Sequence, residues 1–172
     1  MKGDFVDHIS FKVNNLEYHE AGEEFREGTR MYDEAVVGKF NLMLNDRKPY
    51  SGMPYKINLS ESAFNLFQIY EKSEQNIFEG YVLTCVCGVK ECAKVKWRVK
   101  QKGGKMNIEM SDNLDNEHGV YSVDKKDYLK ELSSLLTILI DFTSSRGISE
   151  VNGRDVDIFQ EKIEKITDLR RK

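Results

Sequence analysis

Two adjacent stretches of this chain have regular but different apolar spacing, and together they restrict the fold more than any other feature. Between residues 95 and 110, apolar side chains occupy every second position and mostly charged or polar side chains lie between them. A period of two is typical of strands with one buried face. Gly103-Gly104 divides the stretch and is typical of a tight hairpin turn. The predicted inward-facing side chains are Val95, Trp97, Val99, Met106, Ile108 and Met110.

The next stretch changes to apolar steps of three and four residues, which is the period of an amphipathic helix. Asp124 is placed to cap this helix, and Gly147 is placed to end it. An earlier strand is indicated by Tyr81, Leu83, Cys85 and Cys87, which alternate on one side. The predicted fold class is α+β, with an antiparallel sheet that includes a three-stranded meander (about 78–111). A long helix (about 124–145) and a C-terminal helix (about 155–170) are predicted to cover this sheet.

The first half of the chain gives weaker patterns. Alternation predicts strands over residues 5–13 and 36–44, whereas the Glu-rich residues 16–33 lack an apolar period and are read as a surface connection. Residues 61–72 have helical spacing, although their aromatic content leaves a strand as the alternative. No repeat or Pro/Ser/Gly-rich linker divides the sequence, so one globular domain over residues 1–172 is expected.

Composition and charge exclude several classes. The sequence begins without an apolar export signal and contains no apolar run of the ~20 residues that a membrane span requires, so a cytoplasmic protein with free thiols is expected. The net charge of −3 is too acidic for a typical nucleic-acid binder. A basic stripe is therefore read as a solvated sheet face. It comprises Lys94, Lys96, Arg98 and Lys100.

Catalytic motifs are absent from the sequence. It contains no G-x-S-x-G, H-E-x-x-H, P-loop or G-x-G-x-x-G pattern, so the protein is predicted not to be an enzyme and no catalytic residue is assigned. An enzyme of undetected type stays as an alternative. It would need a pocket that unites His118 or His8 with a cysteine or an acid.

Three cysteines, Cys85, Cys87 and Cys92, fall within eight residues and form the main candidate site. Thiolates are preferred zinc ligands, and a structural zinc site takes four ligands in a tetrahedron. The fourth would come from His118, His8, His19 or an acid. The alternative is that Cys85 and Cys87 fill the buried side of a strand as small apolar residues. Apart from this possible zinc ion, no cofactor is expected.

The Glu-rich connection is the candidate partner surface. Acidic side chains with interspersed tyrosines suit a basic protein partner, because charge speeds encounter and aromatic rings bury much area with few rotors. The residues predicted to contact such a partner are Glu20, Glu23, Glu24, Glu27, Tyr18 and Tyr32.

The segment from Tyr81 to Val99, Y-V-L-T-C-V-C-G-V-K-E-C-A-K-V-K-W-R-V, resembles small bacterial cytoplasmic proteins. Some of these are immunity proteins paired with polymorphic or contact-dependent toxins. Because immunity proteins bind a toxin and block its active site, the resemblance implies a non-enzymatic toxin inhibitor. Taken with the acidic candidate surface, this leads us to expect a basic toxin domain, such as a nuclease, as the partner.

Overall fold

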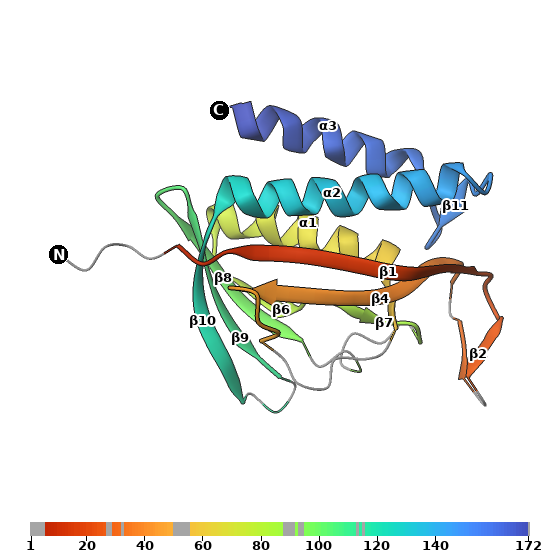
Figure 1. Cartoon of the computed structure of the whole chain (residues 1–172), viewed down its shortest axis with the longest axis horizontal. Coiled ribbons are helices and arrows are strands. Elements are labelled where there is room, and N and C mark those ends of the chain that lie inside the picture. Colours follow the sequence, from red (N-terminus) through yellow and green to blue (C-terminus); the bar gives the residue numbers. More distant parts are fainter. Residues whose placement is uncertain are drawn as a thin grey trace.

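The described residues form three helices packed against antiparallel sheets, which confirms the α+β class (Figure 1). Within this part of the chain, two sheets have four strands each, and two short hairpins accompany them. This computed structural model describes residues 6–26, 29–31, 33–49, 56–87, 92, 95–112, 114 and 116–171. None of the helices within these residues combines the length and the apolarity needed to cross a bilayer.

The first sheet contains the predicted meander and one further strand. Its alternation is as expected, because Trp97, Val99 and Ile108 are at most 1% exposed. Gly103 and Gly104 have φ of 58° and 80°, which suit the two-residue hairpin turn between the second and third meander strands. In order across the sheet, the strands are β10 (Glu117–Asp124), β9 (Lys105–Ser111), β8 (Lys96–Lys102) and β6 (Phe78–Tyr81).

The predicted strand through Tyr81, Leu83, Cys85 and Cys87 is wrong in one respect. The strand β6 ends at Tyr81, and the chain passes through buried Val82 and Leu83 into a different sheet. Both residues are buried, so the alternation does not continue across the change of sheet.

The second sheet is built around the predicted strand at 36–44. Residues 20–24 are exposed, as predicted for a surface connection over residues 16–33, but the lack of strands in that prediction is wrong, because the first strand continues to His19 through a bulge in which Asn15 has φ of 54°. A short hairpin follows, formed by β2 (Glu24–Arg26) and β3 (Thr29–Arg30). Phe5, the first residue of the predicted strand, lies outside the described residues. The order across this sheet is β1 (Ile9–His19), β4 (Ala35–Leu44), β5 (Ile57–Asn58) and β7 (Thr84–Cys85).

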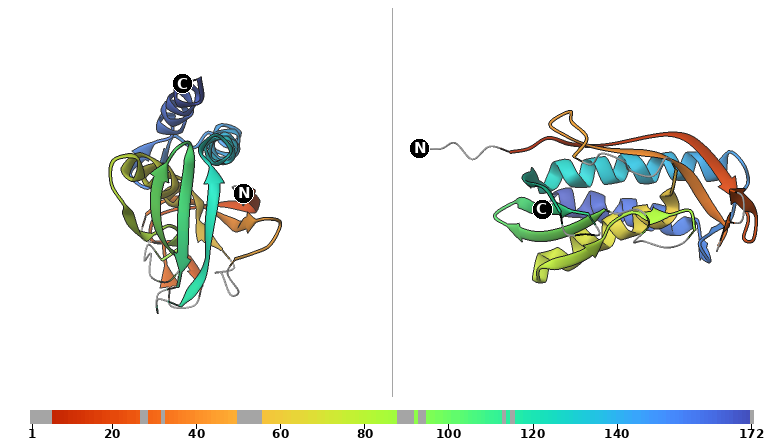
Figure 2. Two further views of the ribbon diagram at one scale, coloured as in Figure 1. Left: turned by 90° about the vertical axis from the view of Figure 1, so that its left-hand side faces the viewer. Right: turned by 90° about the horizontal axis from the view of Figure 1, so that it is seen from below.

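The two sheets meet at a seam between the start of the described chain and β10. Asp7 forms a parallel bridge with Val123. Its backbone N–H donates to the Ser122 carbonyl at 2.7 Å, and its carboxylate accepts from the Ser122 N–H at 2.7 Å. At the other side, β6 runs directly into β7. The two sheets are therefore linked at both sides, and Figure 2 shows them below the helices.

Three helices cover the sheets, and each begins with a local signal that the sequence contains. The Asn58 side chain accepts from the Glu61 N–H at the start of the first helix, and Asp124 accepts from the N–H groups of Lys126 and Asp127 at the start of the second. The helices are α1 (Leu59–Gln75), α2 (Lys125–Ser144) and α3 (Asp157–Arg171), with the hairpin β11 (Glu150–Val151) and β12 (Arg154–Asp155) before α3. These bounds confirm the predicted helices.

The helices lie in two layers over the sheets (Figure 1). In the inner layer α2 runs along β1 and reaches β10, while α1 packs against β4 and β8. In the outer layer α3 packs on α2, and Phe159 of α3 stacks on Phe64 of α1 at 5.1 Å between ring centroids. The predicted cover is confirmed, and α1 adds to it. One large core joins side chains from both sheets and all three helices.

Candidate metal centre

The structure brings the three cysteines together at the end of β7. Cys85 is the last residue of β7 and pairs with Ile57 of β5, Cys87 lies in the turn that follows, and Cys92 lies further along the chain, before β8. The three Sγ atoms all lie within 4.8 Å of one another. The Sγ atoms of Cys87 and Cys92 are 3.7 Å apart. The local change from strand to turn therefore gathers thiols that the sequence places at irregular spacing.

The cluster has one shielded thiol and one open thiol. Cys85 packs against a small second core formed by Met31, Ala35, Val37 and Val86, whereas Cys92 is exposed and Cys87 is half-buried. The alternative that Cys85 and Cys87 fill the buried side of one strand is wrong, because neither is fully buried and Cys87 lies beyond the end of β7. An ion would reach the cluster from the Cys92 side.

The protonation state of Cys85 depends on whether a cation is bound at the cluster. Burial raises the pKa of Cys85 to about 11, and a backbone hydrogen bond from Cys87 partly offsets that rise. The neighbouring Cys87 and Cys92 contribute smaller rises that are already included in this value. Without a cation, Cys85 therefore stays a neutral thiol at neutral pH. A bound cation would reverse this, because it stabilises neighbouring thiolates.

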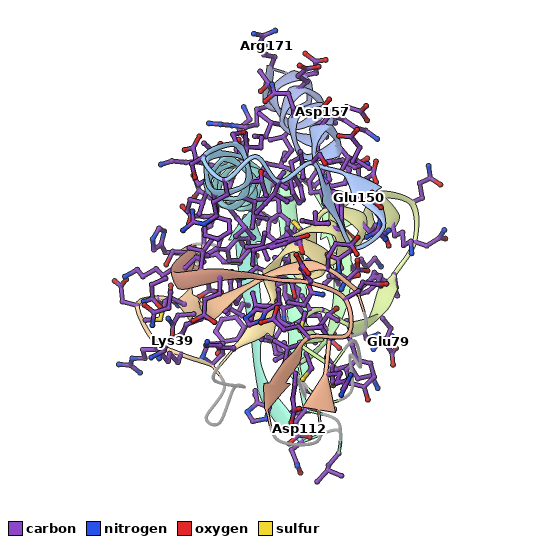
Figure 3. The ribbon with its side chains drawn as sticks, turned by 90° about the vertical axis from the view of Figure 1, so that its right-hand side faces the viewer. Lys39, Glu79, Asp112, Glu150, Asp157 and Arg171 are labelled. Carbon is purple, nitrogen blue, oxygen red and sulfur yellow. The ribbon has the colours of Figure 1, made fainter. Side chains whose placement is uncertain are left out.

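The histidines considered as fourth ligands lie in other environments. His19 lies between Glu17 at 3.2 Å and Glu23 at 3.1 Å, and the backbone N–H of His8 donates to Asn45. His118 Nε2 lies 3.5 Å from Asp112 Oδ2, at the end of the molecule opposite α3 (Figure 3). Within the described residues, no His, Asp or Glu places a ligand atom within 4.8 Å of all three thiols.

The turn that holds Asp112 has its own hydrogen-bond pattern. The Asp112 carboxylate accepts from the Leu114 and Asn116 N–H groups and from the Asn116 side-chain amide. These bonds, with the Asn116 amide as the largest contribution, lower the pKa of Asp112 to about 2. His118 lies near the start of β10, just after this loop. The loop is thus held by an ionised carboxylate.

The basic stripe on β8 faces acidic residues of the neighbouring strands. The register places Glu79 of β6 and Glu109 of β9 on either side of Arg98. Arg98 lies 3.9 Å from Glu79 and 3.5 Å from Glu109, and Lys96 lies 3.5 Å from Glu79. These side chains line a shallow hollow of about 420 Å³ on the outer face of the sheet. The other cations of the stripe are Lys100, which is exposed, and Lys94, which lies outside the described residues.

The ion pairs between Arg98 and the neighbouring glutamates were not predicted, although the sequence contains part of the information needed to predict them. Because Ile108 and Met110 face inward, alternation places Glu109 on the same outer face as Arg98. Register between strands cannot be read from one strand alone, so Glu79 was not identified. The face carries alternating charges and not a row of cations.

Among the predicted partner residues that the structure describes, Tyr18 lies near the end of β1, Glu20 and Glu23 lie in the turn after it, and Glu24 begins β2. Figure 1 shows the β2–β3 hairpin at the far end of the long axis from the N label. Glu20, Glu23 and Glu24 are exposed, and Glu23 accepts from the Glu20 N–H. Tyr18 is half-buried against the main core, and burial is the largest cause of its raised pKa. Glu27 and Tyr32 lie outside the described residues.

Comparison of the chain with protein-family models, with curated proteins and with solved structures finds no match in any of the three. The likeness to immunity proteins therefore stays a prediction. Roles for individual residues have to be argued from the geometry of this chain.

Proposed function

We propose that the protein is a metal-binding protein that holds zinc through Cys85, Cys87 and Cys92. The observation that supports this proposal is the convergence of three Sγ atoms within 4.8 Å. In a tetrahedral site with Zn–S bonds of about 2.3 Å, sulfur atoms are roughly 3.8 Å apart. The 3.7 Å between Cys87 and Cys92 is close to that spacing. Small side-chain rotations would bring Cys85 to the same separation.

Zinc in this position would have a structural role. It would tie the end of β7 to Cys92, next to the small second core on which Cys85 packs. Binding free energy at such a site adds to folding free energy, since the unfolded chain does not preassemble the ligands. Three ligands come from the cysteines, and the fourth comes from water or from a further group.

Metal analysis of protein purified without added zinc tests this proposal. We expect about one zinc per chain, consistent with one site. Replacing zinc with cobalt should give thiolate-to-metal charge-transfer absorption. Cys87→Ser should lose both signals, whereas His118→Ala should keep them because His118 lies elsewhere. A wild-type protein that fails to take up zinc or cobalt under reducing conditions would disprove the site.

We propose protein binding by an acidic segment as a second candidate function, as expected for a toxin inhibitor. This segment, residues 17–34, contains the β2–β3 hairpin and is called the acidic hairpin below. Residues 17–34 contain seven acids and two arginines, and Glu20, Glu23 and Glu24 among them are exposed. A basic partner would be attracted to such a surface at long range, and the attraction would weaken with salt.

Affinity purification with matched charge variants tests the acidic hairpin. One variant carries Glu23→Gln, Glu24→Gln and Glu27→Gln, and the control removes the same number of charges with Glu161→Gln, Glu164→Gln and Asp168→Asn at exposed positions of α3. A basic protein retained by wild type and by the control, but released by the hairpin variant, would support this function. Equal retention by all three would place the partner on another surface.

A further inference from the structure

We infer that Cys87 and Cys92 are a peroxide-sensitive thiol pair that closes to a disulfide while Cys85 stays reduced. The two sulfur atoms are 3.7 Å apart, and four residues lie between the two cysteines in the chain. Because a disulfide bond is about 2.05 Å long, the sulfurs must approach by roughly 1.7 Å. Rotation of an exposed cysteine side chain covers such a distance, and Cys92 is exposed.

Cys85 is excluded from the pair by its surroundings. Its backbone is fixed in β7 by pairing with Ile57, and its side chain packs on Met31 and Val37. That small core covers part of the Cys85 side chain, whereas Cys92 is exposed, so peroxide reaches Cys92 more readily than Cys85.

The chemistry requires a peroxide as the oxidant and proceeds in two steps. The Cys92 thiolate attacks one peroxide oxygen, so that an S–O bond forms, the O–O bond breaks, and hydroxide leaves and takes up a proton as water. Cys87 then attacks the sulfur of this sulfenic acid. An S–S bond forms, the S–O bond breaks, and a second water leaves. Two thiols lose two electrons in total, and hydrogen peroxide is reduced to two waters.

Oxidation would also empty the metal site, and this step alone rests on the proposed function. A disulfide between Cys87 and Cys92 removes two of the three thiolates, and the remaining thiol is a poor ligand alone. Zinc would then be released, and reduction of the disulfide would restore the site. In a reducing compartment such a disulfide is transient, as expected of a sensing pair.

The experiment treats the full-length protein, in apo and zinc-loaded form, with hydrogen peroxide and follows intact mass. We expect the loss of two hydrogens, a peptide map with Cys87 linked to Cys92, and alkylation at Cys85. A chromogenic chelator should report zinc release in step with the mass change. Cys85→Ser should keep the disulfide. Cys87→Ser should stop at a sulfenic acid on Cys92 that dimedone traps.

Two outcomes would overturn the inference. One is a disulfide that includes Cys85 as the main product, and the other is an unchanged mass in both wild type and Cys85→Ser. Failure of the proposed function is distinguishable, because a protein that binds no zinc but still links Cys87 to Cys92 supports the thiol pair and disproves the metal site.

Discussion

Replacing Tyr128 with phenylalanine should destabilise the fold by removing one buried hydrogen bond. The Tyr128 hydroxyl donates to the Leu66 carbonyl of α1 at 2.7 Å, and the residue is 0% exposed. Its ring stacks on Tyr70 with 6.3 Å between centroids, and Tyr128→Phe keeps this contact. A buried hydrogen bond of this kind contributes about 1 kcal/mol net. Since the Leu66 carbonyl lies within α1, it keeps an intrahelical partner. We therefore expect the free energy of unfolding to fall by about 1–2 kcal/mol.

Urea unfolding followed by Trp97 fluorescence measures this loss. The midpoint should fall without a change in slope, and the melting temperature should fall by about 2–4 °C for each kcal/mol. Tyr70→Phe is the matched control, because the Tyr70 hydroxyl makes only a 3.4 Å contact with Glu74. It should cost less than about 0.5 kcal/mol. If Tyr70→Phe proved as costly as Tyr128→Phe, the assignment of the loss to the Leu66 bond would be refuted.

Three further predictions concern charge and pH. Arg154→Ala should lower the free energy of unfolding by about 1 kcal/mol, measured by urea titration, because Arg154 lies 2.6 Å from Glu61 in a partly exposed pair; an unchanged midpoint would contradict it. Burial raises the folded pKa of Tyr70 to about 12, whereas unfolded tyrosine ionises near 10. Unfolding then releases protons above about pH 10, so the melting temperature should fall from pH 10 to 12, and less steeply in Tyr70→Phe. The lowered pKa of Asp112, about 2, gives stability that is present above about pH 4 and is lost as pH falls toward 2. Asp112→Asn should reduce this acid-range loss in a pH series of melting curves.

The sequence predicted those elements whose burial pattern is regular. The meander strands β8 and β9 have one buried and one solvated face, so Trp97 and Ile108 appear at a strict period of two. The helix α2 combines a long apolar stripe with Asp124 as its cap. In both cases local preference and tertiary burial agree, which is the condition under which single-sequence reasoning succeeds.

The strands that were missed have weak or interrupted patterns. The bulge at Asn15 changes the register of β1, so alternation before and after it does not match. The strand β10 begins with Glu117, His118 and Gly119, which are typical of a turn, and few of its side chains are buried. In both strands the backbone pairing is set by a neighbouring strand and not by local side chains.

The candidate metal centre was accessible from the sequence only in part. The short spacing of Cys85, Cys87 and Cys92 indicated that the thiols would be near one another. Their accessibility depends on where β7 ends and on which core Cys85 contacts, and both are tertiary features. The fourth ligand was not predictable, because the distances of His8, His19 and His118 from the cluster follow from chain topology.

The seam between Asp7 and Ser122 joins segments 115 residues apart in the chain. Bringing such distant segments together costs conformational entropy before any contact compensates it, so we expect the seam to close late in folding. Asp7→Ala should then speed unfolding in stopped-flow experiments and leave the refolding rate unchanged. A slower refolding rate would show that the seam forms early. With the seam open, the edge of β10 would be free to pair with a strand of another molecule. Aggregation would then start from a nearly native species and not from the unfolded chain.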